Sequence, residues 1–212
     1  MRSGRRVYAG GVQADLVRWT YDRRARWYDA IVRALSLGGD MRYRRRAVGA
    51  LRLRPGQRVL DVGCGTGLNF GILADAVGPA GLVVGTDLSR EMLRVARDPR
   101  ARRVQARASE RLFRPGSFDA ALSTYVISTL LDECVVEPIV EAVRPGGRVV
   151  IVDDRLPPGW FVGPGFMFSN LRRRGWPDLR RETIRALQPH LRNVEVATCH
   201  GGMIYIISGD RA

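Results

Sequence analysis

Val59-Leu60-Asp61-Val62-Gly63-Cys64-Gly65-Thr66-Gly67 joins a short apolar run to a loop that carries three alternating glycines. The apolar run predicts a strand that ends at Asp61, and the stretch after the loop predicts a helix that extends to Val77. Glycine adopts turns that other residues avoid, and it lets the backbone approach a ligand closely. The helix behind the loop adds oriented amide groups at its N-terminus. This segment therefore predicts a strand, a loop and a helix that together hold a small-molecule ligand.

The spacing of the glycines separates two kinds of ligand. A dinucleotide-binding loop follows the pattern Gly-x-Gly-x-x-Gly, but the sixth position counted from Gly63 is Leu68. An enzyme that uses NAD is therefore disfavoured. A second acid, Asp87, ends the next predicted strand 20 residues after Gly67. Because a carboxylate at that place can accept both hydroxyl hydrogens of a ribose, we expect a ligand that contains a nucleoside.

Strand-like and helix-like segments alternate from Arg58 onward. This alternation predicts an α/β fold with a seven-stranded, mostly parallel, Rossmann-like sheet and helices on both faces. Ser89 is expected to cap the helix after the second strand. The predicted strands cover residues 58–61, 82–86, 103–107, 118–123, 148–153, 194–198 and 203–208. The predicted helices run from the glycine loop to residue 77 and then over 90–97, 132–143 and 179–187, and a turn is expected at 144–147.

The segment before this core predicts helices. Apolar and aromatic residues recur there at spacings of three and four, which predicts one helix with these residues on a single face. They are Tyr21, Ala25, Tyr28, Val32 and Leu35. A second helix is expected over 41–51. We therefore predict one domain, in which a helical cap (1–55) belongs to the Rossmann-like core (56–212).

The composition excludes some chemistries. All 35 basic residues are arginine, so a Schiff-base lysine and a phosphate-loop lysine are both absent. Three widely spaced cysteines, Cys64, Cys134 and Cys199, argue against a disulfide framework, and no metal site is expected. Residues 1–58 hold 15 arginines against four aspartates and no glutamate, an excess of 11 positive charges. Such asymmetry points to an anionic partner or to a solvated basic face.

The motifs resemble those of class I S-adenosylmethionine-dependent methyltransferases, and most of all those of the ubiquinone/menaquinone-biosynthesis and bacterial phospholipid N-methyltransferases. The likeness is strongest over residues 21–97. The landmarks that carry it are the acid-x-Gly-x-Gly-x-Gly loop, Tyr21, Tyr28-Asp29, Leu35-Ser36-Leu37-Gly38, Tyr43-Arg44-Arg45-Arg46, Gly85-Thr86-Asp87-Leu88-Ser89, Met92-Leu93, Arg144-Pro145-Gly146-Gly147-Arg148 and Gly201-Gly202.

The resemblance implies S-adenosylmethionine as the cofactor. The loop would hold its amino-acid part, Asp87 its ribose, and Leu88 and Met92 its adenine, while Tyr28 would close over the methyl donor. Ser109 stands where the family usually has an acid that meets the adenine amine. The residues expected to bind the cofactor are Asp61, Gly63, Cys64, Gly65, Gly67, Asp87, Leu88, Met92, Ser109 and Ser123.

Candidates for catalysis and for the acceptor follow from their places in the predicted fold. A general base is needed only where the nucleophile loses a proton, and Asp153 and Asp154 at the end of the fifth strand are better placed than His190 or His200. The acceptor pocket is expected to include Tyr43 and Tyr125. A long aromatic segment, 155–176, is predicted to form a lid with Trp160 and Phe161, or alternatively to pack on the sheet.

The sequence thus predicts a cytosolic methyltransferase for a small hydrophobic or amphiphilic acceptor: quinone-like, a phospholipid head group or a natural product. The basic cap with its tryptophans favours visits to an anionic membrane surface. An RNA methyltransferase that holds nucleic acid with this cap is the alternative, although nucleic acid is disfavoured because no RNA-binding module is visible. A catalytically inactive binding protein also stays open, as does the choice between monomer and homodimer.

Overall fold

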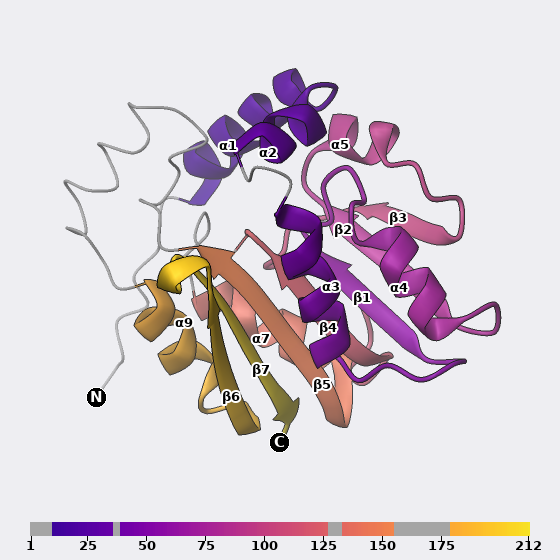
Figure 1. Ribbon diagram of the computed structural model, residues 1–212, viewed down its shortest axis with the longest axis vertical. Coiled ribbons are helices and arrows are strands. Elements are labelled where there is room, and N and C mark those ends of the chain that lie inside the picture. Colours follow the sequence, from indigo (N-terminus) through magenta and orange to yellow (C-terminus); the bar gives the residue numbers. More distant parts are fainter. Residues whose placement is uncertain (1–9, 36–38, 127–132, 155–178) are drawn as a thin grey trace.

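The computed structural model describes residues 10–35, 39–126, 133–154 and 179–212. Within these residues, seven strands form one sheet in the order β3-β2-β1-β4-β5-β7-β6 (Figure 1). The prediction of a seven-stranded α/β sheet is confirmed. The strands are β1 (Arg58–Val62), β2 (Leu82–Asp87), β3 (Ala101–Gln105), β4 (Phe118–Thr124), β5 (Val143–Asp154), β6 (Leu191–Cys199) and β7 (Ile204–Arg211).

The sheet is mostly parallel. Strands β1 to β5 pair in parallel, whereas β7 runs antiparallel to both β5 and β6. In this register Asp61 lies beside Gly85 of β2 and Leu122 of β4. The ends of β1, β2, β4 and β5 therefore meet at one edge of the sheet, which we call the carboxyl edge.

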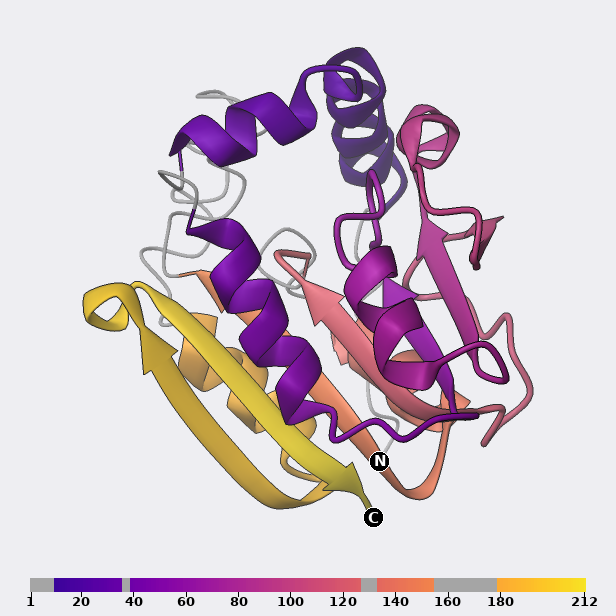
Figure 2. The same cartoon turned by 45° about the vertical axis from the view of Figure 1, so that its right-hand side comes forward.

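Alternating strand residues feed two hydrophobic cores, one on each face of the sheet. Val59 and Leu122 pack under α3, α4 and α5, while Leu60 and Ile151 pack under α7 and α9. Figure 2 shows α3 and α4 side by side on the near face. These helices are α3 (Asp40–Ala50), α4 (Phe70–Val77), α5 (Arg90–Val95), α7 (Glu133–Ala142) and α9 (Leu179–Leu187), and a 3₁₀ turn η1 (His200–Gly202) precedes β7.

Two further helices, α1 (Gly10–Arg24) and α2 (Tyr28–Leu35), lie across the carboxyl edge (Figures 1 and 2). The single helix predicted from the aromatic stripe is wrong, because the chain turns over residues 25–27. Tyr21 and Tyr28 still lie together across this turn, with ring centroids 5.9 Å apart. The break lets α1 and α2 meet different parts of the core, as their aspartates show below.

Several strand boundaries also differ from the prediction: β6 begins three residues earlier than expected, at Leu191, and β7 extends three residues further, to Arg211. β3 begins two residues earlier than expected, because Ala101 pairs with Val83 of β2. The turn predicted at 144–147 lies within β5 as a bulge, since Phe118 pairs with Val143 but Ala120 pairs with Arg148. Residues 144–146 are exposed and Gly146 has φ +71°, so the predicted turn forms as an interruption inside a longer strand.

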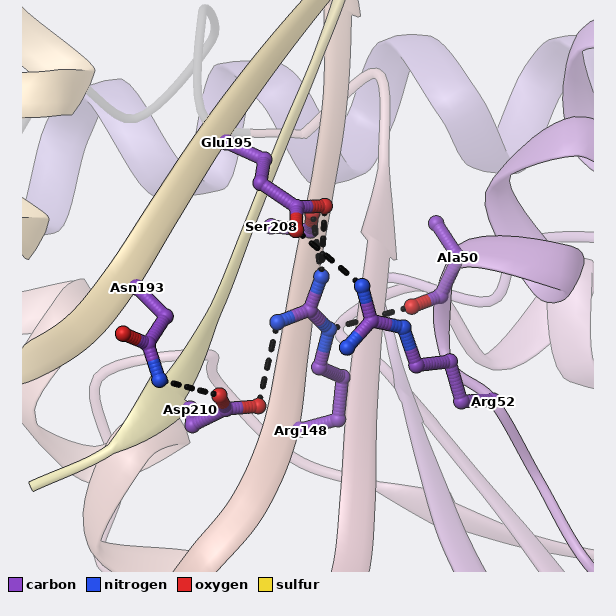
Figure 3. A network of polar contacts seen from close by, with 7 residues as sticks. All are labelled: Ala50, Arg52, Arg148, Asn193, Glu195, Ser208 and Asp210. Carbon is purple, nitrogen blue, oxygen red and sulfur yellow. Dashed lines mark hydrogen bonds and ion pairs between the residues drawn. The ribbon is translucent and has the colours of Figure 1, made fainter.

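A polar network at the opposite end of the sheet ties α3 to the last strands (Figure 3). The buried Arg148 of β5 donates to the backbone oxygen of Ala50, to Asp210 and Ser208 of β7, and to Glu195 of β6. We call this group the Arg148 network. It holds the C-terminal end of α3 on the sheet.

Candidate functional site

The glycine loop has the backbone geometry that its sequence predicts. Gly63, Gly65 and Gly67 have φ values of +67°, +56° and +78°, in the left-handed region that favours glycine. A Cβ at Gly63 would lie 2.2 Å from a Val126 methyl, and one at Gly67 would lie 2.6 Å from the Phe70 ring. A Cβ at Gly65 would meet nothing within 4 Å. Two of the glycines are therefore needed for packing, while Gly65 faces open space that a ligand can fill.

Asp87 lies at the end of β2, directly against this loop. One carboxylate oxygen accepts from the Gly65 N–H at 2.8 Å, and the other accepts from the Ser89 N–H at 2.8 Å. Burial raises the pKa of Asp87 above its usual range, and these two N–H donors oppose that rise. Each oxygen keeps a second lone pair, so the carboxylate can also receive ribose hydroxyls. The predicted cap is confirmed, because Ser89 accepts from the Met92 N–H.

Asp61 is buried at the end of β1 beneath the loop. The side-chain amide of Asn69 donates to both of its oxygens at 3.1 Å. Burial raises the pKa of Asp61 to about 7, against the lowering effects of Asn69 and of the nearby Arg44. A cationic ligand group beside this carboxylate would favour its ionised form.

The cap contacts the same site through two aspartates. Asp22 of α1 accepts a hydrogen bond from the Ser89 hydroxyl, next to Asp87. Asp29 of α2 accepts from the hydroxyl of Thr66, inside the glycine loop. Tyr28 begins α2 next to Asp29, and burial raises its pKa to about 12, so it stays protonated at neutral pH. The cap is thereby fastened over the predicted cofactor site.

Tyr125 follows β4 with a left-handed backbone, at φ +60°. A bulky residue in this conformation is strained, and such strain is concentrated at functional sites. Its N–H donates to Val152 of β5, and the Arg44 guanidinium lies 5.5 Å from its ring centroid. Burial raises the pKa of Tyr125 well above its usual value, and the charges of Asp40, Asp154 and Asp153 add to the rise. The hydrogen bond to Val152 brings Tyr125 beside the end of β5, where Asp153 and Asp154 follow.

The ends of β4 and β5 bring further predicted residues to the carboxyl edge. Asp153 is buried and accepts from the Asp154 N–H at 3.0 Å, while Asp154 is partly exposed. The buried hydroxyl oxygen of Ser123 has no hydrogen-bond partner among the described residues. Because buried polar groups are nearly always paired, this hydroxyl is suited to a bound molecule.

The remaining predicted residues are less central. The Cys64 sulfur points into the core, since a Cβ on Gly85 would lie 2.8 Å from it, so only the Cys64 backbone belongs to the loop surface. Leu88 and Met92 flank the start of α5, Ser109 is exposed after β3, and Tyr43 is half-buried on α3. Trp160 and Phe161, and with them the predicted lid, lie outside the described residues. The individual binding roles of all these residues stay predictions.

Sequence reasoning missed Arg44, which is linked to Asp61 through the side chain of Asn69. Arg44 of α3 is buried and donates to Asp40 at 2.6 Å, to Asn69 at 3.0 Å and to Thr124 at 3.0 Å. An arginine within the run Tyr43-Arg44-Arg45-Arg46 carries no local sign of burial. Its spacing of four from Asp40, on the face shared with Ala47, is the one available signal.

The comparisons with known proteins agree with this geometry. Residues 60–151 match the family described as a methyltransferase domain. A demethylmenaquinone methyltransferase from Desulfitobacterium hafniense is 31% identical, over 77% of this chain and 69% of its own. A 2-phytyl-1,4-naphtoquinone methyltransferase from Synechococcus elongatus is 34% identical, over 68% of this chain and 65% of its own. The solved phosphoethanolamine N-methyltransferase 2 of Haemonchus contortus, in complex with S-adenosyl-L-methionine, is 28% identical with a TM-score of 0.54, over 69% of this chain and 35% of its own.

The chain belongs to the class I S-adenosylmethionine-dependent methyltransferases. The predicted enzyme class and cofactor are therefore confirmed, and the relatives point to a small-molecule acceptor. The residues fit the cofactor, because they offer open space at Gly65, a carboxylate at Asp87 that can receive hydroxyl groups and a buried carboxyl group at Asp61. None of the helices in the described part of the chain combines the length and the apolar character that crossing a bilayer requires.

Proposed function

We propose that this methyltransferase acts on a small amphiphilic, quinone-like acceptor whose flat ring lies against Tyr125. The observation that carries the proposal is the strained backbone of Tyr125, which holds an aromatic residue at the carboxyl edge, hydrogen-bonded to Val152 beside the end of β5. A flat aromatic ring packs well on such a side chain. The quinone methyltransferases among the relatives support the same class of acceptor.

The side chains at this edge suggest how such an acceptor would react. When bound, S-adenosylmethionine supplies an electrophilic methyl group on a sulfonium. The reduced, hydroquinone form of the acceptor provides a nucleophilic ring carbon, which must lose its proton after methylation. Asp154 is the better proton acceptor, because it is partly exposed, whereas Asp153 is buried and orients it through the Asp154 N–H. Tyr28 and the cap would exclude water while donor and acceptor are aligned.

The outer face of the cap suits an amphiphilic acceptor that resides in lipid. Trp19 and Trp27 are 58% and 70% exposed, and the Arg23 guanidinium lies 5.0 Å from the Trp19 ring centroid. Arg18 and Arg26 are exposed close by. Tryptophan and arginine together are typical of a surface that rests on an anionic membrane. The proposal therefore includes reversible binding of the cap to anionic lipid.

An acceptor panel tests the proposal. Purified protein receives S-adenosylmethionine labelled in its methyl group, together with a reduced isoprenylated naphthoquinone, phosphatidylethanolamine or transfer RNA. We expect label in the hydroquinone, and about a hundredfold less with Tyr125→Leu, because misplacing an aligned acceptor costs about that factor. Gly65→Val is the control that removes cofactor binding. If the label appeared only in the lipid or only in the RNA, the proposed quinone-like acceptor would be wrong.

The same preparation tests the lipid surface by sedimentation with phosphatidylglycerol vesicles. Binding should weaken with salt, because exposed charges are screened. It should also fall with Trp19→Ser and Trp27→Ser, whereas Arg94→Gln on α5 serves as a matched control. Protein that remains in the supernatant at low salt would remove the membrane part of the proposal and leave a soluble acceptor.

A further inference from the structure

A continuous row of buried polar groups connects α3 to the cofactor site. Asp40 accepts from Arg44, Arg44 donates to the amide oxygen of Asn69, and the amide nitrogen of Asn69 donates to Asp61. The hydroxyl of Thr124 accepts from both Arg44 and Asn69. All five residues are buried. We call this row the Arg44 network.

The network decides which way the Asn69 side chain faces. An amide has a donor end and an acceptor end of nearly the same shape. Arg44 has donors only, so it binds the oxygen end and turns the NH₂ end toward Asp61. Without the guanidinium, the amide could rotate and present its oxygen to the carboxylate. Asp61 would then face an acceptor in a buried place, which is costly.

We propose that Arg44 is a positioning residue of the cofactor site, which acts through the Asn69 amide to hold the Asp61 carboxylate ready for the cationic amino group of S-adenosylmethionine. This inference rests on the methyl transfer that defines the family and is independent of the proposed acceptor. Arg44 also contacts the ring of Tyr125, the residue that we propose to lie against the acceptor.

Charge supports this role. When Asp61 is ionised, Asp40, Arg44 and Asp61 together leave one negative charge in the network, which the cationic cofactor can balance. The ionisable groups that act on or near Asp61 are Arg44 from α3, Asp87 from β2 and the Cys64 thiol of the loop. Burial raises the pKa of Asp61 to about 7, and Arg44 opposes that rise. Removing Arg44 should therefore raise this pKa further.

Calorimetric titration with S-adenosylhomocysteine between about pH 5.5 and pH 8.5 tests the proposal without catalysis. In the wild type, affinity should fall as the pH drops below about 7, because protonated Asp61 cannot pair with the ligand ammonium. For Arg44→Gln we expect the midpoint of this fall to rise by about one unit, so that affinity at low pH drops about tenfold. Arg45→Gln, an exposed neighbour on the same helix, should match the wild type.

Four further variants decide between a positioning and a structural role. Asn69→Ala should raise the midpoint as Arg44→Gln does, and Arg44→Lys should restore it in part. The double variant Asp40→Asn/Arg44→Gln removes both charges of the buried pair. If the proposal holds, the midpoint of its pH-dependent affinity stays above that of the wild type. A return to the wild-type midpoint in this double variant would overturn it, as would a uniform loss of affinity at every pH in Asn69→Ala. Asp61→Asn should abolish the pH dependence, and a dependence that survives this change also overturns the proposal.

Discussion

Two buried arginines organise opposite ends of the sheet, and their partners differ. Arg44 binds Asp40, whose side chain is 8% exposed, and otherwise the neutral groups of Asn69 and Thr124. Arg148 binds Asp210 and Glu195, and the Glu195 side chain is 59% exposed. The carboxylates around Arg148 therefore remain partly hydrated, while the single one beside Arg44 does not.

The difference separates stability from function. Every partner in the Arg148 network joins α3, β5, β6 and β7 to one another, and none lies at the carboxyl edge (Figure 3). The Arg44 network instead ends on Asp61, directly beneath the glycine loop. Because a buried charge pair is costly to assemble, we interpret the Arg44–Asp40 pair as one that orients the groups around Asp61. We expect substitutions in the two networks to affect different measurements.

The largest effect on stability is expected for Arg148→Met. It leaves the Ser208 hydroxyl and the Ala50 carbonyl without their donor and separates two carboxylates from their shared cation. The free energy of unfolding should fall by about 3 kcal/mol. Affinity for S-adenosylhomocysteine should stay within about twofold, since a factor of two is below 1 kcal/mol. Denaturant unfolding and calorimetry check both values, and a large loss of affinity would erase the contrast between the networks.

Asp61→Asn should have an intermediate effect of the opposite sign. The pKa of Asp61 is raised by burial to about 7, so ionising this residue opposes folding above that pH, and the cost disappears as the pH falls toward about 4. The variant should therefore raise the free energy of unfolding of the cofactor-free protein by about 2 kcal/mol at pH 8. The gain should vanish near pH 4. Unfolding curves at both pH values check this, and a loss of stability at pH 8 would contradict it.

The smallest effect is expected for Glu195→Gln. Glu195 pairs with Arg52 and Arg148, but it is largely exposed, and Arg148 keeps Asp210, Ser208 and Ala50. Exposed pairs contribute little, so the free energy of unfolding should fall by less than about 1 kcal/mol, and by less still in high salt. Urea titrations at two salt concentrations measure the change. A cost equal to that of Arg148→Met would mean that this pair dominates the network.

The fold and the centre of the cofactor site could be predicted because their signals are local. The glycine loop needs positive φ values at fixed positions, and Asp61 and Asp87 end neighbouring parallel strands, which places them at one edge. The break between α1 and α2 could not be predicted, because the aromatic stripe continues through it. The break separates Asp22 from Asp29, and each aspartate accepts a hydrogen bond from a hydroxyl far along the chain, that of Ser89 or that of Thr66. That β5 already begins at Val143, before the turn, likewise follows from the pairing of Val143 with Phe118 of β4.

By itself, the sequence determined the class of fold and the common edge of Asp61 and Asp87, since spacing and backbone preference are properties of short segments. The cofactor followed from the resemblance to a methyltransferase family that the same motifs carry. Only the tertiary structure decided that Arg44, among four arginines of its helix, is buried and reaches Asn69 and Thr124, 25 and 80 residues away. It also decided that Tyr125 takes a left-handed backbone. The physical reason is that burial and hydrogen-bond partners arise from contacts between distant segments, which no local pattern encodes.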